Sequence, residues 1–140
     1  MLAKLQPLLC SFARGLSTKP WKVTGLNHVA MVVPDVEKAA TFYRDTFGVQ
    51  VDKPFLISPI DEHSPVAKFL ERNKSGGLHH ICVEVDDLRG AVEGIKKKNL
   101  RFLAPEPKVG ACGLPVIFMH PKDANGVLIE LEASHSTEGH

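Results

Sequence analysis

The segments LNHVAMVV (residues 26–33) and LHHICVEV (residues 78–85) match at a constant offset of 52 positions. Both are short, apolar and rich in β-branched residues, which is typical of buried strands. Asp35 follows the first segment and Asp87 follows the second, and each can cap the start of a helix with its carboxylate. The sequence therefore repeats a strand together with the beginning of a helix.

The helical faces are repeated as well. Apolar residues follow Asp35 and Asp87 at helical spacing and again differ by 52 positions: Val36, Ala39, Ala40 and Tyr43, then Leu88, Ala91, Val92 and Ile95. We expect the two helices to end near Gly48 and Asn99. Residues 101–103, 114–120 and 127–132 follow as strand candidates, so module two (residues 78–132) is predicted to be a βαβββ unit.

Module one (residues 24–63) is too short to copy this unit. Residues 64–73 are predicted to form a linking helix, with Ser64 as N-cap and Pro65 at the first helical position. Only residues 48–63 remain for three strands. Because strands average about 5–6 residues, one strand or a tight hairpin fits there. We predict an α+β fold over residues 24–133 in which the first of two βαβββ modules is truncated.

The bulk composition fits one globular domain of 140 residues. Its 17 basic and 16 acidic residues lack the basic excess of a nucleic-acid-binding protein. No run of 18 apolar residues is present, so we expect no membrane partner either. The three cysteines are odd in number and form no CxxC pair, which favours a reducing compartment.

Residues 1–20 are predicted to be a mitochondrial presequence and linker. This stretch is basic, contains serine and has no acidic residue, since the first acid in the chain is Asp35. The sequence around Arg14 resembles a matrix-protease site with cleavage after Leu16. We therefore expect the protein in the mitochondrial matrix. Residues 134–140 are predicted to be a polar tail.

Two histidines and one carboxylate are the candidate metal ligands. His28 and His80 occupy equivalent places in the repeat, and Glu130 interrupts an apolar strand where an unpaired carboxylate would be costly. Together they suit a divalent transition metal, although the pattern alone leaves open hydrogen-bonded strand histidines. Strand alternation predicts that His79 faces away from this site. Lys108, His120 and Lys122 are candidates for substrate contact or for solvated surface.

Six further stretches are distinctive: GLNHVA (25–30), VPDVEKAA (33–40), SPVAKFL (64–70), NKSGGLHHICVEV (73–85), GLPVIFMHPKD (113–123) and VLIELE (127–132). Together they resemble the animal methylmalonyl-CoA epimerases, a family of metal-dependent members of the vicinal-oxygen-chelate (glyoxalase-like) superfamily. The resemblance covers residues 24–54 and 59–132. It implies two βαβββ modules around a divalent ion such as cobalt or manganese.

The resemblance also implies roles for particular residues. Two of the family's ligand histidines match His28 and His80, and its closing-strand glutamate matches Glu130. The fourth ligand comes from the last strand of module one, and the repeat offset places it at Leu78, which module two already uses. Some two dozen residues are absent between about Phe55 and Ser58. The family's module-one glutamate, a general base, has no counterpart, and Glu62 or His63 near the gap could replace it.

The implied activity is that of an isomerase. It interconverts (R)- and (S)-methylmalonyl-CoA by proton transfer at C2, with Glu130 as a catalytic residue, in propionate and branched-chain amino acid catabolism. The implied partners are an acyl-CoA substrate and a second copy in a homodimer. Because of the gap we expect little activity from this chain. The alternatives are a two-histidine, one-carboxylate ring-cleaving dioxygenase and a non-catalytic metal-binding or interaction protein.

Overall fold

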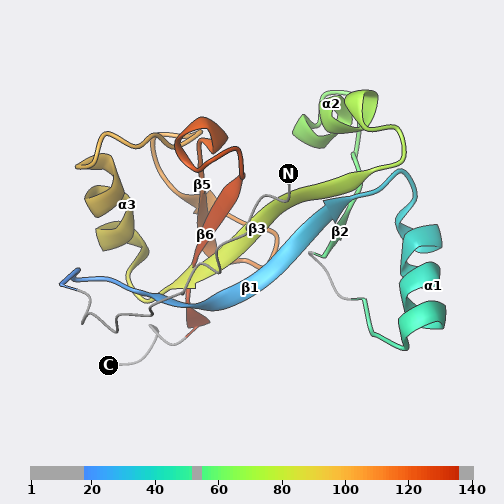
Figure 1. Cartoon of the computed structure of the whole chain (residues 1–140), viewed down its shortest axis with the longest axis horizontal. Coiled ribbons are helices and arrows are strands. Elements are labelled where there is room, and N and C mark those ends of the chain that lie inside the picture. Colours follow the sequence, from blue (N-terminus) through green and yellow to red (C-terminus); the bar gives the residue numbers. More distant parts are fainter. Residues whose placement is uncertain (1–17, 52–54, 136–140) are drawn as a thin grey trace, which may run out of the picture.

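A computed structural model describes residues 18–51 and 55–135. Six strands form one curled, mixed sheet in the order β2-β1-β3-β6-β5-β4 (Figure 1). The elements are β1 (Val23–Val32), α1 (Val36–Phe47), β2 (Leu56–Ile57), α2 (Pro65–Arg72), β3 (Gly77–Val85), α3 (Leu88–Lys96), β4 (Lys108–Val109), β5 (Pro115–Met119), the 3₁₀ turn η1 (Pro121–Asp123) and β6 (Ile129–Ala133). The predicted α+β class is confirmed.

The two repeated strands, β1 and β3, lie side by side and antiparallel at the centre of the sheet. His28 pairs with Cys82, and Ala30 pairs with His80. These two pairs are equivalent under the 52-residue repeat, so the strands are related by a local twofold axis. The pairing is interrupted at Asn27 on β1 and at His79 on β3, where one extra residue forms a β-bulge. The two bulges are also repeat-equivalent.

Module two forms the predicted βαβββ unit. Strand β6 runs parallel to β3, and β5 and β4 continue the sheet in antiparallel order. The predicted strand at 101–103 is reduced to a single bridge between Phe102 and Met119. The second strand of this module is instead β4, which is two residues long. A loop with Pro105 and Pro107 separates the bridge from β4, and proline cannot donate a ladder hydrogen bond.

Module one retains one short strand among its described residues. Met31 pairs with Leu56 in β2 as its repeat mate Val83 pairs with Leu131 in β6. Strand β2 is therefore the closing strand of module one. Leu56 follows Met31 by 25 positions, whereas Leu131 follows Val83 by 48, so module one is 23 positions shorter. The missing stretch precedes β2, which corrects the expected gap between Phe55 and Ser58.

The helix boundaries follow the predicted capping signals. Asp35 accepts a hydrogen bond from the backbone N–H of Lys38, and Asp87 accepts one from Gly90. Helix α1 ends at Gly48, which adopts the left-handed conformation with φ 66°. Helix α3 ends at Lys96, three residues before Asn99, although Asn99 does adopt a left-handed φ of 59°. The linking helix α2 lies within the predicted range, residues 64–73.

The hydrophobic core belongs to module two. The predicted inner face of α3 is fully buried against β3, β5 and β6, together with Trp21. The matching face of α1 is only half-buried, and no residue of α1 is buried. Figure 1 shows α3 and α1 at opposite ends of the sheet. Helix α1 packs poorly because, among the described strands, only β1 and the two-residue β2 lie beneath it.

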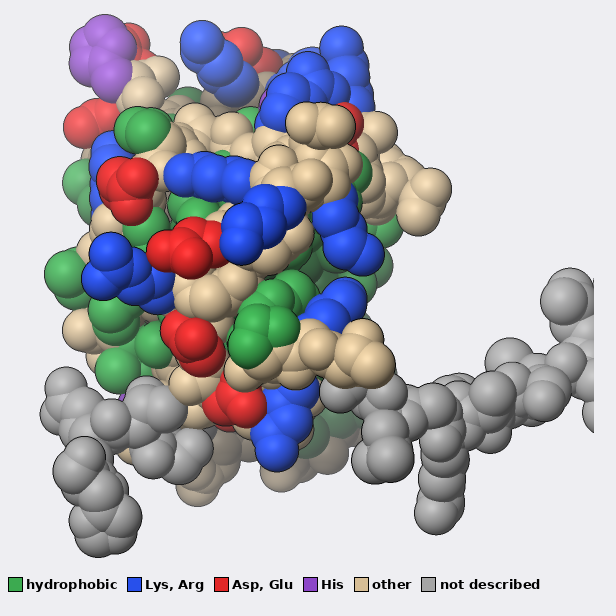
Figure 2. Space-filling model, turned by 90° about the vertical axis from the view of Figure 1, so that its left-hand side faces the viewer, with side chains coloured by type: hydrophobic (Ala, Val, Ile, Leu, Met, Phe, Trp, Pro, Cys, Tyr) green, Lys and Arg blue, Asp and Glu red, His purple; other side chains and the backbone are tan. Residues whose placement is uncertain are grey.

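The surface on the α3 side carries interleaved basic and acidic side chains (Figure 2). Lys96, Lys97 and Lys98 at the end of α3 are exposed, as expected of cations at a helix C-terminus. None of the helices in the described part of the chain is long and apolar enough to cross a membrane. The predicted presequence and most of the polar tail lie outside the described residues.

Candidate metal centre

Three neighbouring strands bring the predicted ligands together. His28 comes from β1, His80 from β3 and Glu130 from β6, and the two imidazole rings lie 5.5 Å apart between centroids. The Nε2 atom of His28 is 3.6 Å from Oε2 of Glu130, and that of His80 is 2.9 Å from the same oxygen. The convergence predicted from the repeat is therefore present, and one carboxylate oxygen lies between two imidazole nitrogens.

These nitrogens are buried without a hydrogen bond. The side chain of His28 is 9% exposed and that of His80 is 5% exposed. Neither Nε2 atom has a partner of acceptable hydrogen-bond geometry within the described ranges, although Glu130 is close. Buried polar atoms are nearly always satisfied in folded proteins. Two unsatisfied nitrogens directed at one carboxylate fit a cation that the donors would share.

Cys82 is a further donor that sequence reasoning did not select. It is fully buried on β3, opposite His28. Its Sγ, a ring nitrogen of His28 and a carboxylate oxygen of Glu130 all lie within 4.8 Å of one another, so the three could hold a metal ion. Burial, and then the charges of Glu130 and Glu132, raise the pKa of the Cys82 thiol. The signal in the sequence was its position two residues after His80, on the same strand face.

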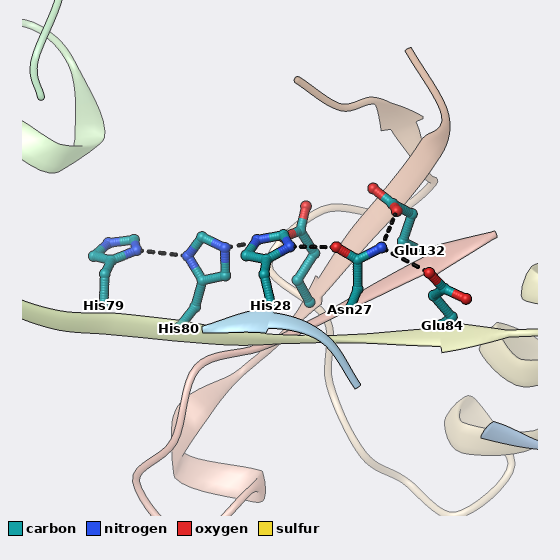
Figure 3. A network of polar contacts seen from close by, with 7 residues as sticks. Asn27, His28, His79, His80, Glu84 and Glu132 are labelled. Carbon is teal, nitrogen blue, oxygen red and sulfur yellow. Dashed lines mark hydrogen bonds and ion pairs between the residues drawn. The ribbon is translucent and has the colours of Figure 1, made fainter. Parts of the chain in front are cut away.

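The β-bulges bring the residues before both histidines into the site (Figure 3). The Nδ1 atom of His28 lies 2.6 Å from Oδ1 of Asn27, and that of His80 lies 2.9 Å from Nδ1 of His79. The expectation that His79 faces away is wrong, because the bulge at His79 interrupts strand alternation. Asn27 and His79 are repeat mates, so the bulges give the two histidines equivalent neighbours.

Asn27 also connects His28 to two more carboxylates. Its amide nitrogen donates hydrogen bonds to Glu84 at 2.7 Å and to Glu132 at 3.1 Å, as Figure 3 shows. Glu132 is 3% exposed. Burial, followed by the charges of Glu130 and Glu84, raises its pKa. Since the amide nitrogen donates, Oδ1 of Asn27 accepts from Nδ1–H of His28, which leaves the Nε2 lone pair free for a ligand.

Burial also favours the neutral form of His28 and His79. The pKa of His28 is lowered by desolvation, with the Glu130 charge opposing and His80 adding to the shift. Desolvation and His80 likewise lower the pKa of His79. Neutral imidazole is the form that binds metals, so the electrostatics agree with the geometry.

The cluster lies in the wall of a cavity of about 650 Å³, which is in the size range of small-molecule sites. Its wall combines the site residues with apolar side chains of β2 and β5 and the loop that contains β4. Lys108 lines this cavity, whereas His120 and Lys122 do not. Glu62 and His63 also lie outside it, with side chains 87% and 88% exposed. The suggested replacement bases are therefore not in the cleft.

Comparison with known proteins identifies the family. The model of the Glyoxalase/Bleomycin resistance protein/Dioxygenase superfamily matches residues 25–131. The chain belongs to the glyoxalase superfamily. The paired modules around a shared cleft are therefore the glyoxalase fold, as predicted.

Among curated members of the glyoxalase superfamily, the chain is similar to mitochondrial methylmalonyl-CoA epimerases. It is 47% identical to that of Mus musculus over 136 residues, covering 83% of this chain and 76% of the mouse protein. It is 48% identical to that of Homo sapiens over 132 residues, covering 80% and 75%. Since 83% of 140 residues is only about 116, roughly twenty aligned positions of the mouse protein have no counterpart here. This agrees with the 23 positions missing from module one.

Solved glyoxalase-superfamily structures are similar as well. Methylmalonyl-CoA epimerase from Mycobacterium tuberculosis superposes with a TM-score of 0.73 at 30% identity, covering 86% of this chain and 93% of that one. A methylmalonyl-CoA epimerase in complex with methylmalonyl-CoA and NH4+ gives a TM-score of 0.74 at 29% identity, covering 85% and 100%. The sheet and helices of these enzymes are thus retained over most of the chain.

The register shows which residue of module one corresponds to Glu130. Because Leu56 takes the place of Leu131, the residue before it, Phe55, takes the place of Glu130. The expected mate, Leu78, is wrong, because a constant offset of 52 does not hold across the missing stretch. In this member of the glyoxalase superfamily a phenylalanine therefore stands where the repeat would place a second closing-strand carboxylate.

Proposed function

We propose that this chain interconverts (R)- and (S)-methylmalonyl-CoA by proton transfer at C2, with activity reduced by the shortened first module. The observation that carries this is the convergence of His28, His80 and Glu130 in a cavity, in a chain that is 48% identical to a methylmalonyl-CoA epimerase. That similarity favours an isomerase over a ring-cleaving dioxygenase.

We propose His28, His80 and Glu130 as ligands of one divalent ion, cobalt or manganese. The two unsatisfied Nε2 atoms and the buried carboxylate between them support this assignment. An ion held there would supply Lewis-acid stabilisation of negative charge on the thioester and carboxylate oxygens of the substrate. The protein contributes by holding the donors in place and by burying them away from bulk water.

Glu130 is the proposed proton-transfer residue. It is 7% exposed and lies in the wall of the cavity, where a carboxylate could take the C2 proton and return it. A group on one side of C2 returns the proton to the face from which it came, so inversion needs a second group on the other face. The counterpart position in module one, Phe55, cannot supply one. Proton exchange should therefore be faster than epimerisation in this chain.

The substrate and the compartment follow from the same similarity. The apolar cavity wall suits an acyl-CoA, and Lys108 at its edge is available to an anionic group of the coenzyme. The mitochondrial names of the mouse and human relatives support a mitochondrial location. The basic start of residues 1–16 supports import into the matrix.

The test measures deuterium uptake at C2 of methylmalonyl-CoA and the stereochemistry of the product. The parent chain should exchange deuterium faster than it inverts the centre, and Glu130→Gln should lose exchange by about 10²–10⁴-fold. Glu106→Gln alters a carboxylate of the same cavity outside the metal cluster and is the matched control. Equal exchange by the parent and Glu130→Gln would contradict the assignment of Glu130.

A further inference from the structure

Module one lacks a donor at the place where the repeat would supply one. Phe55 occupies the position equivalent to Glu130, and its ring packs edge-on against Tyr43 of α1, with centroids 5.7 Å apart. A phenyl ring offers no nitrogen, oxygen or sulfur to a cation. If three protein groups hold an ion, its remaining positions are open to any further donor nearby.

Cys82 is such a donor. Its Sγ lies within 4.8 Å of both a ring nitrogen of His28 and a carboxylate oxygen of Glu130. The position is fixed by the sheet, since Cys82 pairs with His28 on β1 and with Glu130 on β6. The residue is completely buried, so no competing solvent contact holds the sulfur away from the site.

A second observation points independently to a ligand at this place. The buried Nε2 atoms of His28 and His80 have no hydrogen-bond partner among the described residues. Their Nδ1 atoms, by contrast, are both in contact with neighbouring side chains. The two unsatisfied nitrogens thus both lie close to Oε2 of Glu130, and the sulfur of Cys82 lies within 4.8 Å of a carboxylate oxygen of the same residue.

We propose that Cys82 is a fourth protein ligand of the divalent ion, in place of a donor from module one. This rests on the metal site of the proposed function and extends it. On binding, the S–H bond of Cys82 breaks, a sulfur–metal bond forms, and the proton is released to solvent. The donor set is then two imidazoles, one carboxylate and one thiolate.

A thiolate changes which ions the site prefers. Manganese favours oxygen donors, whereas sulfur selects softer ions, and the general affinity order already places cobalt and zinc above manganese. The site should therefore bind cobalt and zinc in clear preference to manganese. This preference distinguishes cobalt from manganese, whereas the family resemblance implies either ion.

The experiment titrates metal-free full-length protein with cobalt(II) and records the absorption spectrum. Sulfur ligation gives an intense near-ultraviolet charge-transfer band that nitrogen and oxygen donors do not. We expect the band in the parent chain and in Cys112→Ser, which removes an exposed cysteine. Cys82→Ser should lose the band, and its preference for cobalt over manganese should fall by roughly tenfold or more.

The spectrum of the parent chain and of Cys112→Ser keeps the test decisive if Cys82→Ser folds poorly. Cys82→Ser combined with Phe55→Glu restores an oxygen donor at the module-one position and should regain cobalt binding without the band. Cobalt bound by the parent without a charge-transfer band would overturn the role of Cys82 alone. Failure of the parent to bind cobalt at all would overturn the proposed metal site, and with it this inference.

Discussion

His28 and His80 each meet, through Nδ1, the side chain of the residue that precedes them. A neighbour at Nδ1 fixes the tautomer and the orientation of an imidazole, so that Nε2 is presented to a metal. The hydrogen-bond network extends further at His28, because Asn27 also donates to Glu84 and Glu132. The orientation of one ligand is thereby tied to carboxylates on two other strands.

At the residue scale, Asn27→Ala should weaken metal binding without removing a ligand. Loss of such a supporting hydrogen bond typically costs about 10–100-fold in affinity. Isothermal titration of the metal-free protein with cobalt measures the change. Asn73→Ala is the matched control, since among residues 18–51 and 55–135 Asn73 makes hydrogen bonds only to the backbone near the end of α2. An Asn27→Ala affinity equal to that of the control would exclude the supporting role.

At the scale of elements, α1 and α3 are equivalent helices of the repeat that lie in different surroundings. Both begin at an aspartate cap and present apolar residues at equivalent positions. Four residues of α3 are buried and none of α1 is, because the sheet under α1 has lost its outer strands. Phe42 and Phe47 of α1 are consequently 55% and 63% exposed. Helix stability comes mainly from such packing rather than from propensity.

Truncating a large apolar side chain should therefore have unequal effects in the two helices. Ile95→Ala in α3 should lower the free energy of unfolding by roughly 2–5 kcal/mol, as for other buried isoleucines. Phe42→Ala in α1 should change it by less than about 0.5 kcal/mol, as for other exposed sites. Urea denaturation of both variants beside the parent gives the comparison. A large loss in Phe42→Ala would mean that α1 is covered by a partner in solution.

Most elements and the three proposed metal ligands could be predicted from the sequence, chiefly because of the repeat. Hydrophobic periodicity located β1, β3 and the inner helical faces, and Asp35 and Asp87 marked the helix starts. The bulges at Asn27 and His79 left no such signal, because one inserted residue does not alter the local composition. The contacts of Asn27 with His28 and of His79 with His80 could therefore not be predicted. The place of Phe55 was hidden for another reason: only strand register, and no fixed offset, aligns it with Glu130.

At the scale of the whole molecule, the missing segment should limit both stability and activity. Inserting the aligned stretch of the human relative between Val51 and Phe55 should raise the thermal midpoint, because added strands would cover α1. Epimerisation should rise by about 10²–10⁴-fold if the insert restores a positioned base. A Gly/Ser insert of equal length is the control. Full epimerase activity in the unmodified chain would show that the segment is dispensable.

Targeting is a separate property of the whole chain, which a fusion can test. Residues 1–25 joined to a fluorescent reporter should direct it to mitochondria, since this stretch is basic and free of acidic residues. The positive charge comes from Lys4, Arg14, Lys19 and Lys22, and changing all four to glutamate provides the control. A diffuse cytosolic signal from the unaltered fusion would contradict the predicted presequence.

Because β2 has only two residues, most of β1 is hydrogen-bonded to a neighbouring strand on one side only. Strand β1 pairs with β3 along most of its length, but among the described residues it meets β2 only at Met31 and Val32. In contrast, β3 has β1 on one side and β6 on the other. Backbone amides of β1 that point away from β3 should exchange with deuterated water quickly, except that of Met31, which donates to the carbonyl of Phe55, and those of β3 should exchange slowly. Although β1 lies inside the sheet, these amides would thus exchange like those of an edge strand.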